Sequence, residues 1–296
     1  VQKRVWTILE MLQWGTSYLS EKGYGESRLT IELLLCHVLN VKRIQLYTNF
    51  DKPLNEAELS SFKALLQRRL QHEPLQYIVG TTEFMGLEFI VDRRVLIPRP
   101  ETEIVVEQVV CYAKVHFSGQ MLRVLDIGTG SGCIAVSLAT LLENASIVAF
   151  DKSSDAVDVA RINAQKNGVE KRITVSVQDI FTVSGANFSS KFHCIVSNPP
   201  YVSKEEFEGL QAEIRDFEPS FAVTDEEDGL SFYRKIAEVG RSFLEAEGAI
   251  IVEHAYNQLA SVEKIFADAG WTNMRPFRDY GENPRCLVAT KFRGPA

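Results

Sequence analysis

The stretch "LRVLDIGTGSGCIAVSLA", residues 122–139, decides the fold class of this chain. An apolar run ends near Asp126, three glycines follow at alternate positions, and the apolar pattern then resumes with helical spacing. This order is typical of a buried strand, a tight turn and a helix. Because the turn carries few side chains and the helix N-terminus offers unpaired N–H groups, we expect a ligand to lie over Gly128, Gly130 and Gly132.

Strand-like and helix-like segments alternate downstream of this stretch. Five more apolar runs of strand length occur, at residues 146–150, 173–177, 192–197, 249–255 and 285–291. Between them lie segments with helical spacing of apolar residues, among them 153–168 and 229–248. This alternation predicts an α/β fold, and we assign residues 101–296 to one such domain.

Residues 1–75 follow a different pattern. Apolar residues recur there at three- and four-residue spacing, which predicts a small helical bundle formed by residues 5–19, 29–39 and 54–70. Residues 83–97 carry a central glycine between two β-favouring runs and predict a β-hairpin, within a connection that we place at residues 76–100. The prolines of "PRPE", residues 98–101, interrupt regular structure, and we expect Glu101 to open the next helix.

Composition and charge bear on the number of domains and on the class of partner. The chain has 296 residues, 45% of them apolar and 24% charged, which is enough for one large domain or two smaller ones. Its net charge is −7, with 10 Lys and Arg against 8 Asp and Glu in residues 1–75 and 22 against 31 in the remainder. Because phosphate binding relies on Lys and Arg, we expect no stable nucleic-acid partner.

The sequence also bears on location and assembly. No apolar run approaches the roughly 20 residues of a membrane span, and the first residues have the pattern of an amphipathic helix rather than of a signal peptide. We therefore expect a cytoplasmic protein that binds no membrane, and we expect a monomer. The five cysteines are odd in number and widely spaced, so we expect no metal site.

Two cofactor classes compete for the glycine turn. Dinucleotide enzymes use G-x-G-x-x-G or A, whereas this turn reads G-x-G-x-G, with an acidic residue two positions ahead and Cys133 in the sixth position. S-adenosylmethionine fits the turn better because it has no pyrophosphate to bind. Asp151 ends the next strand 19 residues after Gly132, where a carboxylate can accept hydrogen bonds from both ribose hydroxyls.

These acidic residues and glycines also have a purely structural interpretation. Glycines make tight turns without any ligand, and Asp151 is placed to cap a helix that starts at Ser153. Asp179, which closes the third strand, can accept a hydrogen bond from the adenine amino group, but a loop aspartate is often only a cap or solvated. The sequence leaves both interpretations open.

The motif "SNPPYVS", residues 197–203, follows the fourth strand and therefore emerges at the same sheet edge as the glycine turn. The prolines fix the backbone and remove N–H donors, which leaves the Pro199 carbonyl and the Asn198 side-chain oxygen as acceptors for both hydrogens of a planar NH2 group. Tyr201 offers a ring for stacking, so an amide or an aminated base fits. The alternative is a rigid loop with a buried aromatic residue.

Four motifs together resemble one family: "IPRPETE" (97–103), "DIGTGSG" (126–132), "SNPPYVS" (197–203) and "DYGENPRCLVA" (279–289). Over nearly its whole length the chain is similar to the HemK or PrmC family, S-adenosylmethionine-dependent N5-glutamine methyltransferases that modify class I peptide chain release factors. The glycine turn and NPPY also occur in amino-methylating DNA and RNA enzymes, so the first motif is the most specific. The resemblance implies a Rossmann-like class I methyltransferase domain behind a helical substrate-recognition domain.

The resemblance also implies roles for single residues. It implies cofactor binding by Gly128, Thr129, Gly130, Ser131, Gly132, Asp151 and Asn198, and on the adenine side by Ile180, a position that is tryptophan in some members. It implies glutamine binding by Asn198, Pro199, Pro200 and Tyr201, of which we expect Asn198, Pro199 and Tyr201 to be catalytic. Arg99, Glu101 and Thr102 match a segment near the active site, although Arg99 and Glu101 can instead serve only to hold the connecting segment.

We expect a direct displacement, in which the glutamine nitrogen attacks the methyl carbon and S-adenosyl-L-homocysteine leaves without a covalent enzyme intermediate. Positioning and electrostatics then supply most of the catalysis, through the acceptors at Asn198 and Pro199. No strong general base is evident. His254, at the end of the fifth strand, is a candidate, but a histidine at such a place is more often structural.

Two other functions remain open from the sequence. An amino-methyltransferase acting on adenine or guanine in DNA or RNA has the same pocket, but the acidic charge opposes it. A non-catalytic adaptor is opposed by the intact glycines, Asp151 and NPPY. The partner that we expect is a class I release factor, bound as a folded protein by the helical domain while the glutamine of its Gly-Gly-Gln loop enters the pocket.

Overall fold

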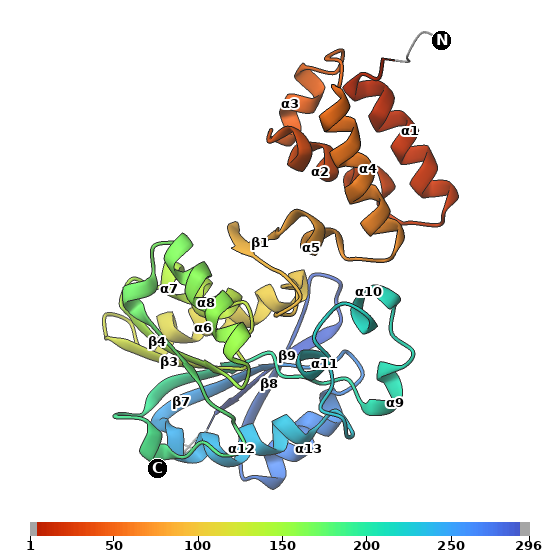
Figure 1. The fold of residues 1–296 in the computed structure, drawn as a ribbon. Helices are drawn as coiled ribbons and strands as arrows, with labels where there is room; N and C mark the ends of the chain where they lie inside the picture. The colour runs from red at the N-terminus through yellow and green to blue at the C-terminus, as the bar shows by residue number, and fades with distance from the viewer. Residues whose placement is uncertain (1–4, 291–296) are drawn as a thin grey trace. The chain divides into compact units, whose positions relative to one another are not determined.

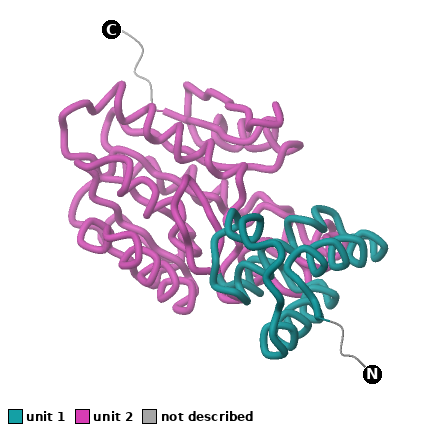
Figure 2. The backbone as a smooth tube through the Cα atoms, turned by 90° about the horizontal axis from the view of Figure 1, so that it is seen from above, with its two compact units in different colours: residues 1–80 teal, residues 81–296 magenta. Residues whose placement is uncertain are grey.

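The computed structural model describes residues 5–290, which divide between two compact units, residues 1–80 and residues 81–296. Figure 2 shows the first unit in teal and the second in magenta. No helix within residues 5–290 combines the length and the apolar character needed to span a bilayer.

The first unit is built from helices, as the sequence predicts. They are α1 (Ile8–Glu21), α2 (Ser27–Leu39), α3 (Arg43–Thr48), α4 (Glu56–Leu70) and α5 (Leu75–Val79) (Figure 1). Helix α1 begins at Ile8 because Thr7 caps it: the Thr7 side chain accepts from the N–H of Glu10, whose carboxylate accepts from the N–H of Thr7. The short helices α3 and α5 were not predicted, since five or six residues show too little periodicity.

The division between the units falls at Gly80, five residues beyond the predicted boundary at residue 75. Residues 76–100 do not form a separate connection, which corrects the predicted organisation. The hairpin of β1 (Thr81–Phe84) and β2 (Leu87–Ile90) belongs to the second unit. The physical reason is Asn163, whose side chain accepts from the N–H of Ile90 at 2.7 Å and donates to its carbonyl at 2.9 Å.

A seven-stranded sheet forms the centre of the second unit, and the predicted α/β fold is confirmed. Its order is β5-β4-β3-β6-β7-β9-β8, with β9 antiparallel to both neighbours and the other pairs parallel. The strands are β3 (Leu122–Ile127), β4 (Ala145–Asp151), β5 (Ile173–Val177), β6 (Phe192–Ser197), β7 (Leu244–Glu253), β8 (Asn273–Arg278) and β9 (Pro284–Thr290).

Two features of this sheet were not predicted. The edge strand β8 was missed because its residues are mostly exposed and show no apolar run. The helix expected over residues 229–248 ends at Phe243, where β7 begins, so the strand is longer than residues 249–255. His254 consequently follows the strand instead of lying within it.

Helices cover both faces of the sheet (Figure 1). On one face lie α6 (Glu103–His116), α7 (Cys133–Leu141) and α8 (Ser154–Lys166), and on the other α12 (Ser231–Phe243) and α13 (Leu259–Asp268). Helix α6 starts at Glu103, after the 3-10 turn η1 (Pro100–Thr102), and not at residue 101. Further short elements are η2 (Glu170–Arg172), η3 (Gly185–Asn187), α9 (Lys204–Phe207), α10 (Ala212–Arg215) and α11 (Ser220–Val223).

The strand order reverses beside β3, which pairs in parallel with β4 on one side and with β6 on the other. Ile127 at its end lies opposite both Phe150 and Ser197, and the Ser197 hydroxyl donates to the Ile127 carbonyl at 2.7 Å. The loops that follow these three strands therefore meet at one sheet edge. Ligands of open α/β sheets bind at such an edge, where the strand order reverses.

Candidate functional site

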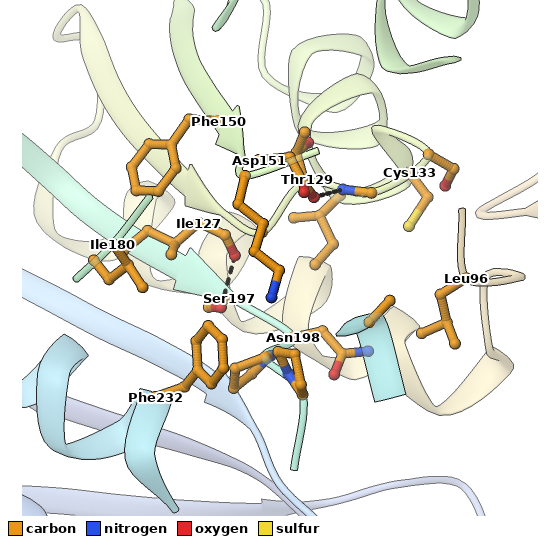
Figure 3. Close-up of a pocket in the computed structure, with 18 of the residues that line it drawn as sticks. Leu96, Ile127, Thr129, Cys133, Phe150, Asp151, Ile180, Ser197, Asn198 and Phe232 are labelled. Atoms are coloured by element: carbon orange, nitrogen blue, oxygen red, sulfur yellow. Dashed lines mark hydrogen bonds between the residues drawn. The ribbon is translucent and has the colours of Figure 1, made fainter. Parts of the chain in front are cut away.

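A pocket opens at this edge and encloses about 830 Å³, including the solvent at its mouth. Its walls come from the segment before α6, the turns after β3, β4, β5 and β6, and the elements α11 and α12. Figure 3 shows Phe150, Ile180 and Phe232 toward one side of this pocket and Leu96 and Cys133 toward the other. Most residues singled out in the sequence line it: Arg99, Gly128, Thr129, Gly130, Ser131, Asp151, Asp179, Ile180, Asn198, Pro199 and Pro200.

The glycine turn requires glycine for its backbone conformation. Gly128, Gly130 and Gly132 have φ angles of 72°, 54° and 80°, which side chains disfavour. Nothing lies within 4 Å of a Cβ built on Gly128 or Gly130, so the turn leaves open space there. Gly132 differs, because a Cβ there would meet Ala160 of α8 at 3.1 Å. Gly132 is not among the lining residues and packs closely against α8, and its cofactor contact stays a prediction.

Asp126 stabilises the glycine turn through a buried hydrogen bond. Its Oδ2 accepts a hydrogen bond from the Thr129 hydroxyl at 2.6 Å, while the residue is completely buried. Burial raises the pKa of Asp126 to about 7, and the hydrogen bond from Thr129 opposes that rise. The carboxyl therefore acts inside the fold and does not line the pocket.

Asp151 lines the pocket and also holds structure together. Its Oδ2 accepts from the N–H of Gly130 at 2.9 Å, as Figure 3 shows, and its Oδ1 accepts from the N–H of Ser153 at 3.0 Å. Ser153 itself caps α8. The capping interpretation is thus correct in part, yet a carboxylate has about four lone-pair sites, so two remain for a ligand. Burial raises the pKa of Asp151, and the hydrogen bonds from Ser153 and Gly130 counter this.

The turn after β5 supplies the next wall. Asp179 accepts from the N–H of Phe181 at 2.9 Å and is half-buried, while Ile180 is buried with 3% of its surface exposed. Sequence reasoning missed the aromatic rings of Phe150 and Phe232, which line the same pocket. Phe150 immediately precedes Asp151 in the sequence, so its position near the end of a strand could have indicated that its ring lines the pocket. Phe232 lies in a helix without any motif.

Asn198, Pro199 and Pro200 line the pocket, and the Asn198 Nδ2 donates to the Thr102 hydroxyl oxygen at 3.0 Å. Tyr201 is not among the lining residues, and its stacking and catalytic role stays a prediction. Its ring packs against the core with α12, and its hydroxyl donates to the Glu253 Oε1 at 3.4 Å. Tyr201 is partly buried, so the alternative of a rigid loop with a buried aromatic residue stays open for it.

The segment before α6 contributes Arg99 and Thr102 to the pocket. The Arg99 guanidinium donates to both carboxylate oxygens of Glu218, each at 2.7 Å, and the Glu218 side chain is only 1% exposed. Glu101 is exposed and does not line the pocket, so its predicted substrate contact is not supported. Arg99 therefore has the structural role that the sequence left open for it. Through Glu218 it links the segment before α6 to the chain between β6 and α12.

Lys152 and His254 follow β4 and β7 at this sheet edge. Lys152, which sequence reasoning missed, lines the pocket with its Nζ 5.3 Å from the centroid of the Phe221 ring. His254 is fully buried, its Nδ1 lies 2.8 Å from the Ala255 carbonyl, and it does not line the pocket. Burial lowers the pKa of His254, which favours the neutral form of its ring. Within residues 5–290 no group of three or more His, Cys, Asp and Glu side chains is arranged to hold a metal.

Both units of the chain resemble known protein families. Residues 10–80 match the family described as PrmC N-terminal domain, and residues 118–272 match a methyltransferase domain. The catalytic domain of hMettl16, solved in complex with a MAT2A 3'UTR hairpin, aligns with a TM-score of 0.57 at 15% identity and covers 94% of this chain and 92% of that one. This likeness shows the fold alone.

Two relatives in sequence are similar over nearly the full length. The release factor glutamine methyltransferase of Geobacter sulfurreducens is 42% identical over 267 residues, 90% of either chain. That of Chlorobaculum tepidum is 39% identical over 289 residues, 97% of this chain and 98% of the relative. Because identity of this extent covers both the helical unit and the pocket, the chain belongs to the family of release factor glutamine methyltransferases.

Proposed function

We propose that the protein transfers a methyl group from S-adenosylmethionine to the side-chain nitrogen N5 of the glutamine in the Gly-Gly-Gln motif of class I peptide chain release factors. The observation that carries this proposal is the meeting of two motifs in one pocket, the glycine turn with Asp151 and the acceptors of Asn198 and Pro199. The names of the relatives in sequence support the choice of substrate.

The residues of the pocket fit an adenosyl cofactor. Gly128 and Gly130 leave open space above a turn with positive φ angles, and Asp151 keeps lone pairs for hydroxyl donors. Asp179 is an acceptor beside the apolar surfaces of Phe150 and Ile180, which suits a flat ring bearing an amino group. When bound, S-adenosylmethionine supplies a methyl group on a positively charged sulfur.

Asn198 and Pro199 hold the acceptor amide. A glutamine nitrogen is a poor nucleophile because its lone pair is delocalised into the carbonyl. The side-chain oxygen of Asn198 and the carbonyl of Pro199 accept its two hydrogens, which turns the lone pair outward and stabilises positive charge on the nitrogen. Positioning by these dipoles is the chain's main contribution to the rate, and no strong general base is required.

The first unit is proposed to bind the body of the release factor. It is a separate compact unit with a slightly basic sequence, which a small-molecule substrate does not require. Methylation of adenine or guanine in nucleic acid is the second candidate, because NPPY also suits an aminated base. The acidic charge of the pocket-bearing unit disfavours it.

Mass spectrometry distinguishes these candidates. Purified class I release factor, an oligonucleotide duplex and a folded RNA are each incubated with the protein and S-adenosylmethionine. We expect one added methyl group on the glutamine of the Gly-Gly-Gln motif and none on nucleic acid. Methylation of a base without methylation of glutamine would overturn the proposed substrate.

A further inference from the structure

The two prolines of NPPY cannot anchor their own backbone. Pro199 and Pro200 have no backbone N–H, so neither residue can donate a hydrogen bond to a neighbouring strand or loop. Upstream, Ser197 is fixed by the pairing of β6 with β3 and by its hydroxyl, which donates to the Ile127 carbonyl (Figure 3). The position of the Pro199 carbonyl, the proposed acceptor for the substrate amide, therefore depends on what holds the chain beyond Pro200.

Gln258 holds the chain at the next residue, Tyr201. The Gln258 Nε2 donates to the Tyr201 carbonyl at 2.8 Å, and the Gln258 Oε1 accepts from the N–H of Ala255 at 3.3 Å. Because a carbonyl only accepts and a backbone N–H only donates, these two partners allow the amide a single orientation. Gln258 immediately precedes α13, but its side chain does not cap that helix. The side chain of Gln258 instead joins the end of NPPY to the chain after β7.

Gly229 packs against the same carbonyl. A Cβ built on Gly229 would overlap the Tyr201 carbonyl oxygen and would lie 3.0 Å from the Gln258 Nε2. The φ angle of Gly229 is 76°, a conformation that side chains disfavour. Because the overlapped atom belongs to the backbone, a side chain at residue 229 has to displace Tyr201 or break its bond to Gln258. Glycine is therefore required here for close approach as well as for its backbone conformation.

Asp225 holds Gly229 in this place. The Asp225 Oδ1 accepts from the N–H of Gly229 at 2.9 Å. The Asp225 Oδ2 accepts from the N–H of Ser231 at 3.0 Å and from its hydroxyl at 2.7 Å. One carboxylate thus fixes both ends of the turn in which Gly229 lies, and the contact with Tyr201 is built into the fold.

We infer that Gln258 and Gly229 are positioning residues for the methyl transfer. They fix the Pro199 carbonyl toward the substrate amide by holding the carbonyl of Tyr201. Peptide planes are rigid and the ring of Pro200 locks its φ angle, so few torsions separate the two carbonyls. A shift at Tyr201 is therefore transmitted to Pro199. The inference rests on the proposed amide methylation only for the identity of the substrate.

The two residues act on the acceptor and not on the cofactor side of the pocket. Neither Gln258 nor Gly229 is among the residues that line the pocket, so they act through NPPY. The glycine turn has its own support, because the N–H of Gly130 donates to Asp151 at 2.9 Å. A displacement of about 1 Å in a reacting group can cost about 100-fold in rate. Loss of the contacts to Tyr201 should thus lower kcat while cofactor affinity stays nearly unchanged.

The experiment compares Gln258→Met, Gln258→Glu and Gly229→Ala with the wild type in the full-length protein. Methionine is similar to glutamine in length but has no hydrogen-bond donor. Glutamate keeps the shape and can still accept from Ala255, but it places an oxygen against the Tyr201 carbonyl. Steady-state kcat and KM are measured at about pH 8.5, where a carboxyl is ionised, with a release factor and saturating S-adenosylmethionine.

Cofactor affinity is measured by calorimetry and folding by thermal unfolding. Asn273→Ala is the matched control for a purely structural loss. It removes a side-chain amide that donates to the Thr290 hydroxyl at 3.1 Å, between β8 and β9. We expect the kcat of this control to match that of the wild type, whatever its unfolding temperature.

We expect Gln258→Met and Gln258→Glu each to lower kcat by about 10- to 100-fold, with cofactor affinity changed less than about twofold. Gly229→Ala should lower kcat in the same range. The double variant of Gln258→Met with Gly229→Ala should lose less than the product of the two single losses, because both changes act through one carbonyl. A role in folding alone would move the unfolding temperature and leave kcat unchanged.

An unchanged kcat in Gln258→Met, or a normal kcat in Gln258→Glu, would overturn the inference. A loss of cofactor affinity as large as the loss of kcat would also overturn it, since the effect would then not be confined to the acceptor. If Gly229→Ala fails to fold, the two variants of Gln258 still decide. A wild type that methylates a base but not glutamine refutes the proposed substrate, and the same variants then test the positioning role on that base.

Discussion

The backbone N–H of Gly130 donates a hydrogen bond to Asp151 Oδ2 at 2.9 Å, which ties the turn after β3 to the end of β4. Asp151 therefore has two roles: it stabilises the glycine turn, and it lines the pocket. Any substitution there acts on both the shape of the turn and the contacts to a ligand.

Asp151→Ala should weaken S-adenosylmethionine binding by about 1.5 to 3 kcal/mol, the usual value for hydrogen bonds to a charged group. Calorimetric titration measures this loss. Asp155→Ala changes an exposed aspartate of α8 nearby and should bind the cofactor normally. Unaltered affinity in Asp151→Ala would contradict the assignment of this carboxylate to the cofactor.

Asn198→Ala should lower the turnover of glutamine methylation by about 100-fold or more, because a preorganised acceptor for the reacting NH2 group is lost. Cofactor affinity should change much less than turnover. Single-turnover kinetics with saturating cofactor separate the two effects. Near-normal turnover in this variant would show that NPPY does not hold the substrate amide.

Arg99→Met should destabilise the protein by about 1.5 to 3 kcal/mol, since it leaves the buried Glu218 carboxylate without its donor. Urea unfolding measures the free energy, and limited proteolysis shows whether residues 204–230 become accessible. The double variant Arg99→Met with Glu218→Gln should be more stable than Arg99→Met alone, because no buried charge remains unpaired. Equal instability of the single and double variants would disprove this account of the ion pair.

Asp126→Asn should gain stability relative to the wild type as the pH rises from about 4 to about 8. Burial raises the pKa of Asp126 to about 7, whereas an unfolded aspartate titrates near 4. The folded wild type therefore binds more protons than the unfolded chain in this window and loses stability with rising pH. Denaturant unfolding at several pH values measures the difference, and a difference independent of pH would refute the assigned burial effect.

Removing residues 1–80 should impair methylation of an intact release factor far more than methylation of a short Gly-Gly-Gln peptide. Binding energy remote from the reacting amide is lost in the first case only. The comparison of kcat/KM on both substrates is made after circular dichroism shows that residues 81–296 remain folded. Equal losses on the two substrates would exclude a docking role for the first unit.

The sequence by itself determined the local structure and much of the pocket. Glycines at 128, 130 and 132 permit the positive φ angles of the tight turn that is found, which other residues disfavour. Apolar periodicity predicted the long helices α1, α2 and α4 and the strands of the sheet interior. Because parallel strands end at one edge, the order of the motifs was enough to bring Asp151 and Asn198 together.

Only the tertiary structure decided what each side chain contacts. Tyr201 turns to Glu253 instead of the pocket, Gly132 packs on Ala160, and Phe232 reaches the pocket from a helix without any motif. Thr102 and Asn198 lie 96 residues apart in the chain, yet their side chains share a hydrogen bond of 3.0 Å. This contact depends on where the segment before α6 packs beside the end of β6, and such distant contacts arise from the packing of the whole core, which no local pattern records.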